Sequence, residues 1–220
     1  MSRPQLFEAV RRPLSDAERR LVRARIRNLV TRGRRGRAMS IPITGAIVLV
    51  LWALTMLASD APRLVITAFW LVVGAGIALW SRRDMTRHEA QLMGGAKGLE
   101  SALKRNEADV FNVRAQSFAE FDEVEDEGAC YAFELPGNRV VFVVGQEFYE
   151  SARFPSLDFS LVYVLDEDDR TVDVIIQKRG AKAKPARRIS AAFKQSVESP
   201  EHLEVRNGTI DDLEAMFSRF

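Results

Sequence analysis

The sequence predicts a membrane α-helical hairpin joined to a cytoplasmic α+β domain, in which a small antiparallel β-barrel or rolled sheet has flanking helices. Three observations lead to this fold class. Residues 41–59 and 64–80 contain no charged residue. Basic residues flank this apolar block, whereas the C-terminal region is acidic. After Phe118 the spacing of apolar residues changes from about 3.6 to 2, as a change from helix to strand requires.

The formal net charge of +2 over 220 residues conceals three regions of different charge. Residues 1–40 contain twelve Arg, no Lys and three acidic residues, a net charge of +9. Residues 41–80 are neutral, and residues 81–220 have 19 basic and 26 acidic residues, a net charge of −7. We therefore expect four parts, which are a basic cytoplasmic arm with an amphipathic helix (1–40), a transmembrane hairpin (41–80), a juxtamembrane helical linker (81–116), and a cytoplasmic β-rich domain with a C-terminal helix (117–220).

The two apolar segments have the length of membrane spans. A helix crosses the hydrocarbon core with about 17–25 mostly apolar residues, which fits 41–59 and, at the lower limit, 64–80. The basic flanks place both termini in the cytoplasm by the positive-inside rule, which predicts a protein of the cytoplasmic (inner) membrane. The alternatives are a buried helical hairpin of a soluble protein and a cleaved signal peptide. The absence of a polar face argues against the first, and the long basic region and second span argue against the other.

Small residues within the second span favour close helix packing. Gly74 and Ala78 are spaced as a small-xxx-small pair. This pair serves either packing within the hairpin or a homo-oligomer. Neither span contains a charged residue, which argues against transport by this chain alone.

The basic arm has the pattern of an amphipathic helix over residues 14–32, ended by Gly33 and Gly36. Ser15 and Glu18 have the spacing of a capping box. We expect the basic face to lie on the anionic inner leaflet, through the candidate lipid contacts Arg19, Arg20, Arg23 and Arg27. A solvated arm and a nucleic-acid contact are the alternatives, and because no base-reading motif is present, no nucleic acid is expected as a partner.

The rest of the chain changes from helix to strand. Residues 82–115 show a helical stripe that Gly94, Gly95 and Gly98 weaken. Alternating apolar residues then predict strands over 118–124, 131–135, 140–144, 157–165 and 172–176. A short helix over 190–197, a strand over 202–206 and a helix over 211–217 capped by Thr209 complete the domain.

Three segments carry a resemblance to known sequences. EDEGACYAFEL (125–135), VVFVVGQEFYE (140–150) and ARFPSLDFSLV (152–162) resemble uncharacterised bacterial membrane proteins with a two-span hairpin followed by a cytoplasmic β-domain of unknown function. The resemblance covers roughly residues 105–205 and implies no activity and no catalytic residues. The layout is also similar to that of bacterial pleckstrin-homology-like membrane proteins, although no motif is shared and fold alone does not imply function.

Two segments are candidate binding surfaces. The loop over 145–159 concentrates polar side chains between strands, and its candidate binding residues are Gln146, Glu147, Tyr149, Arg153 and Asp158. A merely structural loop is the alternative. The basic segment over 178–188 offers further candidate contacts with anionic lipid, namely Lys182, Lys184, Arg187 and Arg188, with a solvated loop as the alternative.

Other residue clusters indicate no catalytic chemistry. One Cys and two His cannot form a Cys/His zinc site, and the acidic run over 120–127 lacks the spacing of a calcium loop. Cys130 has the pattern of a buried strand residue. We find no nucleophile–base motif, and we expect no cofactor and no metal.

The sequence thus predicts a membrane-anchored cytoplasmic binding or regulatory module with an unnamed protein partner. A domain that senses anionic lipid or a small ligand is the first alternative. A membrane-bound enzyme is the second, and its mark would be a pocket in which titratable groups converge around Glu147, Tyr149 and Asp158.

Overall fold

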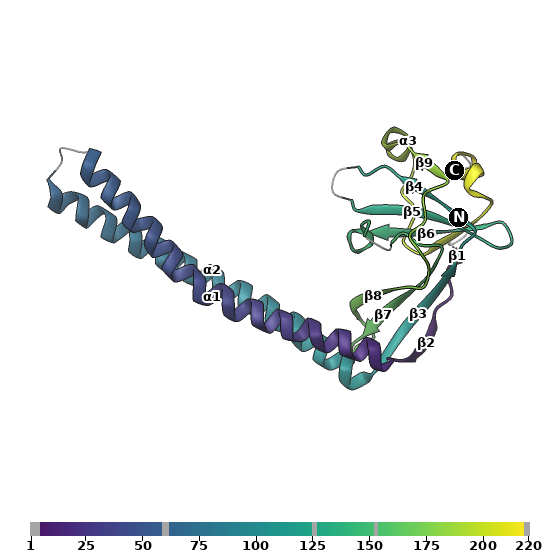
Figure 1. The fold of residues 1–220 in the computed structure, drawn as a ribbon, viewed down its shortest axis with the longest axis horizontal. Helices are drawn as coiled ribbons and strands as arrows, with labels where there is room; N and C mark the ends of the chain where they lie inside the picture. Colours follow the sequence, from purple (N-terminus) through teal and green to yellow (C-terminus); the bar gives the residue numbers. More distant parts are fainter. Residues whose placement is uncertain (1–4, 59–61, 125–126, 152–153, 218–220) are drawn as a thin grey trace. The chain divides into compact units, whose positions relative to one another are not determined.

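The computed structural model describes residues 5–58, 62–124, 127–151 and 154–217, with side chains for all of these except residues 5, 6 and 34–41. The chain forms two compact units (Figure 1). One, the hairpin unit, is Ser15–Arg105, and the other, the β-unit, combines Met1–Leu14 with Asn106–Phe220. The chain is an α+β protein in which helices and strands are segregated.

The hairpin unit consists of two long antiparallel helices, α1 (Asp16–Ala58) and α2 (Arg63–Arg105). The predicted capping box is confirmed, because the Glu18 carboxylate accepts from the Ser15 N–H at 2.6 Å and the Ser15 hydroxyl accepts from the Glu18 N–H at 3.4 Å. At the other helix start, the Ile66 N–H donates to the Pro62 carbonyl at 3.3 Å.

The predicted end of the first helix at Gly33 and Gly36 is wrong, because α1 continues through both glycines. A glycine costs a helix about 1 kcal/mol relative to alanine, a cost that packing against a second helix offsets. A Cβ at Gly33 would lie 3.8 Å from Leu92 of α2, and one at Gly95 would lie 3.9 Å from Leu29 of α1. The two helices therefore pack together at these glycines.

The β-unit contains two sheets. The first, sheet A, has the strand order β1-β10-β6-β5-β4-β9, and the second, sheet B, has the order β2-β3-β7-β8. All pairs are antiparallel except β4 with β9. The strands of sheet A are β1 (Gln5–Leu6), β4 (Ser117–Phe121), β5 (Ala129–Leu135), β6 (Arg139–Gly145), β9 (Arg187–Ile189) and β10 (Glu204–Asn207). The strands of sheet B are β2 (Val10–Pro13), β3 (Glu107–Arg114), β7 (Asp158–Leu165) and β8 (Thr171–Lys178).

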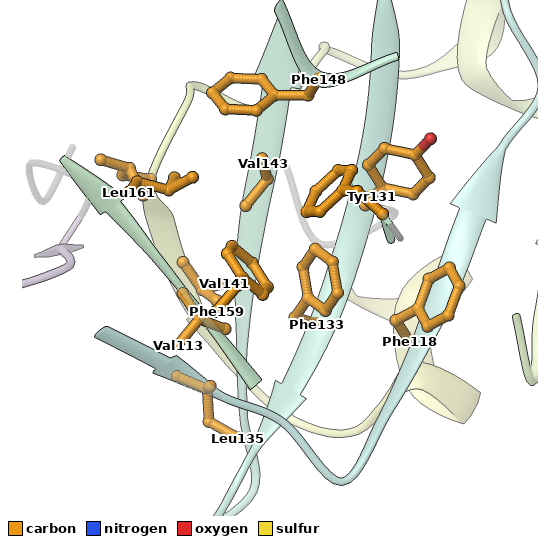
Figure 2. Close-up of a cluster of buried hydrophobic side chains, with 12 residues drawn as sticks. Val113, Phe118, Tyr131, Phe133, Leu135, Val141, Val143, Phe148, Phe159 and Leu161 are labelled. Carbon is orange, nitrogen blue, oxygen red and sulfur yellow. The ribbon is translucent and has the colours of Figure 1, made fainter. Parts of the chain in front are cut away.

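Sheet A is buried on both faces. On one face, Phe133 of β5 and Val141 of β6 pack with Phe159 of β7 in a cluster between the two sheets (Figure 2). On the other face, Ala132 and Phe142 pack with residues of the C-terminal segment, which contains α3 (Ala191–Ser196), the 3-10 turn η2 (Ile210–Asp212) and α4 (Leu213–Phe217). This arrangement explains the continuous apolar run of β6, because successive side chains on a strand point to opposite faces.

The prediction of a barrel or single rolled sheet is therefore wrong, since neither sheet closes into a barrel. A small barrel buries mainly the side chains that point inward. Here residues of both parities in β5 and β6 are buried, which requires a layer on each face of sheet A. Sheet B supplies one layer and the C-terminal segment supplies the other.

Residues 107–114 form strand β3 and not the end of a predicted helix over 82–115. Asn106 has a left-handed backbone with φ of 59°, which ends α2 directly before the strand. The strands at 5–6 and 10–13 have no counterpart in the sequence prediction. The strands predicted at 118–124, 131–135, 140–144, 157–165 and 172–176 are confirmed as β4, β5, β6, β7 and β8.

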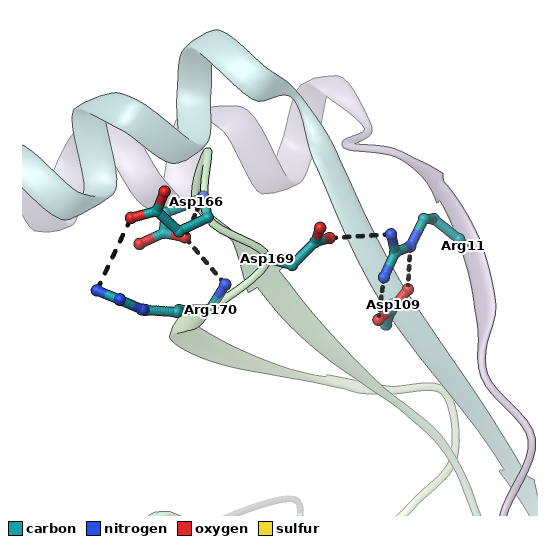
Figure 3. Close-up of polar contacts among 6 residues, drawn as sticks. Arg11, Asp109, Asp166, Asp169 and Arg170 are labelled. Carbon is teal, nitrogen blue, oxygen red and sulfur yellow. Dashed lines mark hydrogen bonds and ion pairs between the residues drawn. The ribbon is translucent and has the colours of Figure 1, made fainter.

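The chain leaves the β-unit through β2 and returns to it through β3, and these two strands are paired. β2 pairs antiparallel with β3, with Pro13 opposite Glu107, and the Leu14 N–H donates to the Asn106 carbonyl at 3.2 Å. The guanidinium of Arg11 adds a two-pronged bond to the Asp109 carboxylate at 2.8 and 3.0 Å (Figure 3). The same guanidinium donates to Asp169 in the turn between β7 and β8 at 3.0 Å, so Arg11 joins three segments of sheet B.

Candidate functional site

The two candidate surfaces of the β-unit, the loop over 145–159 and the basic segment over 178–188, lie side by side. The Arg179 N–H donates to the Asp158 carbonyl and the Ala183 N–H to the Pro155 carbonyl, each at 3.0 Å. Ser156 and Lys182 form an isolated antiparallel bridge. The two segments therefore form one continuous surface, joined by backbone hydrogen bonds, that the sequence alone does not indicate.

Side chains of this joint surface pair with one another. The Lys182 ammonium is bonded to the Glu150 carboxylate, and this hydrogen bond lowers the pKa of Glu150. Lys178 donates to the Ser151 hydroxyl at 2.6 Å. The Arg179 guanidinium lies 3.7 Å from the Asp158 carboxylate. These contacts are exposed, so each contributes no more than about 1 kcal/mol.

The predicted binding residues of the loop do not converge. Gln146 and Glu147 are exposed in the 3-10 turn η1 (Gln146–Phe148). The Tyr149 hydroxyl donates to the Glu123 carboxylate, whereas Asp158 pairs with Arg179. The fifth predicted residue, Arg153, lies outside the described residues. The recorded bonds of Tyr149 and Asp158 therefore go to two different partners, and neither bond joins two of the predicted binding residues.

A polar contact that sequence reasoning missed joins the two sheets next to this loop. The Val144 N–H of β6 donates to His202 Nδ1 at 3.0 Å, and His202 Nε2 bonds the hydroxyl of Tyr163 on β7. The ring of Phe148 stacks on His202 with 4.9 Å between the ring centroids. Because Nδ1 accepts a hydrogen bond, the neutral imidazole carries its proton on Nε2 and donates it to Tyr163.

This environment sets the protonation of both groups. Burial lowers the pKa of His202, and the charge of Glu147 opposes part of this shift. Burial also raises the pKa of Tyr163, so its hydroxyl stays protonated at neutral pH. A second proton on Nδ1 would face the Val144 N–H without an acceptor. The contact is therefore built for neutral His202.

We predict that acid destabilises the β-unit through His202. Because the pKa is lower in the folded than in the unfolded chain, the unfolded chain binds more protons just below the unfolded pKa of about 6.5. Unfolding free energy should fall as pH decreases from 7.5 to 5.5, by up to about 1.4 kcal/mol per pH unit for one proton. Denaturant titration of the full chain at both pH values measures this slope.

The matched controls are the two histidine variants. His202→Gln should flatten the pH dependence over this range. His88→Gln replaces the only other histidine, an exposed residue of α2, and should retain the slope of the parent chain. An unchanged slope in His202→Gln would contradict the assignment of the pH dependence to His202.

The predicted lipid contacts of the basic segment are largely paired with carboxylates. Arg187 bonds Glu214 at 2.5 Å, and Arg188 lies 3.3 Å from Glu120 of the acidic run. Lys182 pairs with Glu150, as described above. Of the four predicted contacts only Lys184, an exposed residue, has no recorded partner among the described residues. The surface therefore offers less free positive charge than its sequence indicates.

The basic face of α1 has fewer recorded ion pairs than the basic segment. Arg19 pairs with Asp16 of the preceding turn at 2.6 Å. Arg20, Arg23 and Arg27 are exposed, and within the described part of the chain none of the three has an ion-pair partner. Their spacing of three and four residues places them on one face of α1.

Buried residues of the β-unit account for two further sequence features. Cys130 is 1% exposed, and burial raises the pKa of its thiol to about 12, as expected for a structural cysteine. The acidic run contributes Glu127 to an ion pair with Lys194 at 2.9 Å. Among the residues that the structure describes, no three His, Cys, Asp or Glu side chains are grouped as a metal site.

The hairpin unit has the apolar surface expected of a membrane segment. Among the described residues one helix, α2, is long and apolar enough to cross a membrane. Of its most apolar 18 residues, 6% are buried, so this stretch is almost entirely exposed. The apolar stretch of α1, Pro42–Ala58, is shorter. By this measure the structure supports one of the two predicted spans.

The same part of the hairpin unit contains a groove of about 810 Å³ between α1 and α2. Two indoles form hydrogen bonds between the helices at this groove. Trp52 Nε1 of α1 donates to Thr67 of α2 at 3.4 Å, and Trp70 Nε1 of α2 donates to Thr55 of α1 at 3.2 Å. These bonds satisfy the polar atoms of both indoles within an apolar surface. The groove is a feature that sequence reasoning missed.

Comparisons with known proteins gave no match. No family model matches the chain, and no curated protein or solved structure matches it.

Proposed function

We propose that this chain is a membrane-anchored cytoplasmic binding or regulatory module, in which the hairpin unit crosses the bacterial inner membrane twice and both termini face the cytoplasm. The pairing of β2 with β3 is the observation that carries the proposal. The chain before α1 and the chain after α2 belong to one folded unit, so they lie on one side of any membrane. If α2 crosses the membrane, α1 must cross it as well.

The exposed apolar surface supports two crossings. Large apolar side chains with exposures above 50% occur in both helices, among them Leu49 (64%) and Leu57 (86%) of α1 and Leu64 (84%) and Val72 (74%) of α2. At a rise of 1.5 Å per residue, the 17 residues of Pro42–Ala58 extend about 26 Å, close to the hydrocarbon thickness of about 30 Å. Because α1 is continuous from Asp16 to Ala58, Arg27 precedes the apolar stretch by 15 residues, about 22 Å along the helix. In this topology Arg20, Arg23 and Arg27 therefore lie in the cytoplasm beyond the headgroup region.

The joint surface of residues 145–159 and 178–188 is the proposed binding surface of this module. It lies on a rigid sheet, it is rich in exposed polar side chains, and its loops are fixed by backbone hydrogen bonds. The separate partners of Tyr149 and Asp158 favour binding over the alternative of a membrane-bound enzyme at these residues. The continuous α1 disfavours the other alternative, contact of Arg20, Arg23 and Arg27 with anionic lipid, because these residues lie about 22 Å or more beyond Pro42, whereas electrostatic attraction is screened over about 8 Å.

Labelling of single cysteines tests the topology. The background is Cys130→Ser, which removes the only native cysteine. We expect Arg63→Cys to react with a membrane-impermeant maleimide in intact bacterial cells. We expect Glu8→Cys and Asp168→Cys, at exposed positions of the β-unit, to react only after lysis.

The pair of β-unit positions makes the test decisive. Glu8 precedes α1 and Asp168 follows α2, so a single crossing would leave one of them reactive in intact cells and the other protected. Two crossings protect both. Labelling of all three sites in intact cells, or of none before lysis, would contradict the proposed topology.

A further inference from the structure

We propose that the groove of the hairpin unit binds one anionic phospholipid, with an acyl chain along the groove and the phosphate at Arg82, an inference that rests on the proposed function. The groove lies within the hairpin unit, and the lining residues that carry the argument are all described. Its volume of about 810 Å³ lies in the range of about 300–1,000 Å³ that ligand sites occupy.

The polarity of the groove changes along its length in the way an amphiphile requires. Apolar side chains and a glycine form its middle, among them Val48 and Leu49 of α1 and Leu71 and Gly74 of α2. Farther from the interhelical turn its lining becomes more polar, with Ser81 and Arg82 followed by Thr86 and Glu89. In the proposed topology this polar end lies at the cytoplasmic headgroup region.

Charge complementarity favours an anionic headgroup at this end. Arg82 is exposed, and among the described residues neither Arg82 nor Ser81 has a recorded hydrogen-bond or ion-pair partner. A guanidinium presents a planar fork of donors that matches a phosphate. The groove also contains Glu89, two helical turns beyond Arg82. A Cβ at Gly33 of α1 would lie 4.0 Å from Cγ of Glu89, so this side chain packs against α1.

The length of the groove fits a lipid of one leaflet. Between Thr67 and Arg82 the groove follows 15 residues of α2, about 22 Å at the helical rise of 1.5 Å. Half of the hydrocarbon thickness is about 15 Å. A chain that starts with its headgroup at Arg82 therefore remains inside the groove to its end.

The native tryptophans report on occupancy of the groove. Trp52 and Trp70 line it, whereas Trp80 is 72% exposed and lies outside it. In a Trp80→Phe chain, both remaining tryptophans are groove reporters. Lipids with brominated chains quench indole fluorescence on contact, so quenching in vesicles measures lipid in the groove.

The test titrates brominated phosphatidylglycerol against brominated phosphatidylcholine in vesicles containing the full chain. We expect an apparent affinity for phosphatidylglycerol about fivefold higher, the factor that one cation near the membrane surface provides. Arg82→Gln should abolish this preference. Arg83→Gln alters an exposed neighbour outside the groove lining and should retain it.

A second pair of variants tests the groove itself. A Cβ at Gly45 or at Gly76 would meet no atom within 4 Å, so leucine fits at both positions. Gly45 lines the groove and Gly76 does not, so Gly45→Leu should reduce quenching and Gly76→Leu should leave it unchanged.

Three results would overturn the proposal. Equal affinity for the two lipids would show that the groove has no binding site for an anionic headgroup. Full quenching in Gly45→Leu places the quenching lipid outside the groove. A dimer that depends on Gly45, without lipid preference, makes a second copy the occupant. Quenching by neither lipid would instead contradict the membrane insertion on which the proposal rests.

Discussion

Replacement of Val72 by arginine is expected to remove most of the protein from the membrane fraction. Val72 lies in the middle of the apolar stretch of α2 and is 74% exposed. Placing an arginine at the centre of a membrane helix costs about 2.5–3.5 kcal/mol on insertion scales, which is about 70- to 400-fold in the insertion equilibrium. The measurement is the share of protein that stays in carbonate-washed membranes.

A matched control separates this effect from damage to the helix. Met93→Arg introduces the same side chain at an exposed position of α2 beyond the apolar stretch, and should leave the membrane share unchanged. On the surface of a soluble protein, arginine at position 72 would change stability by less than about 0.5 kcal/mol. A folded, soluble Val72→Arg protein together with a soluble parent chain would therefore contradict the proposed anchor.

Truncation of either Phe133 or Phe142 is expected to destabilise the β-unit by about 3–5 kcal/mol. Both side chains are fully buried, but they lie on opposite faces of sheet A. Phe133 contacts the rings of Phe118 and Phe159, with centroids 5.4 and 4.9 Å away. Phe142 contacts Phe217, with centroids 5.7 Å apart. Equal losses from the two variants follow from a sheet covered on both faces.

The only cysteine of the chain is a reporter for this prediction. Cys130 is 1% exposed in the β-unit, so its labelling by a thiol reagent requires opening of the core. Phe133→Ala and Phe142→Ala should each accelerate labelling of the detergent-solubilised full chain by about 150-fold or more. Tyr149→Ala, at an exposed position, should change the rate by no more than about twofold. Slow labelling in Phe142→Ala alone would show that only one face of sheet A is tightly packed.

The parts of the fold that the sequence predicts are those with local signals. The capping box at Ser15 and Glu18 is set by residues three apart, and alternation of apolar residues identifies β8. The apolar run of β6 identifies a buried strand. The same run argues against a barrel, because a strand with one inward face would alternate.

The errors arise where tertiary packing outweighs a local signal. Gly33 interrupts the pattern of α1, but contacts with α2 stabilise the helix through it. Val110 and Val113 continue a helical spacing, but they belong to β3. The available signal was Asn106 after the basic last turn of α2, because asparagine adopts the left-handed conformation that ends helices.

The candidate site was predicted as two separate segments because its assembly depends on distant pairings. Lys182 and Glu150 are 32 residues apart, and only the fold of the β-unit brings them together. His202 bonds Tyr163 from 39 residues away, and neither residue has a sequence motif. The groove likewise depends on which side chains of two antiparallel helices face one another, which the turn alone does not specify.

The strand pairings of the N-terminal segment also limit the order in which parts of the chain can fold during synthesis. Gln5 of β1 pairs with Val205 of β10, and Val10 of β2 pairs with Val110 of β3. At about 5–20 residues per second, the ribosome needs roughly 10–40 s to extend the chain from β1 to its partner strand. Both helices of the hairpin unit are synthesised well before then, so in the proposed topology they are available for insertion while β1 is still unpaired. β1 can therefore pair only after β10 has been synthesised, and in the proposed topology this late pairing fixes Gln5 and Val205 on the same side of the membrane.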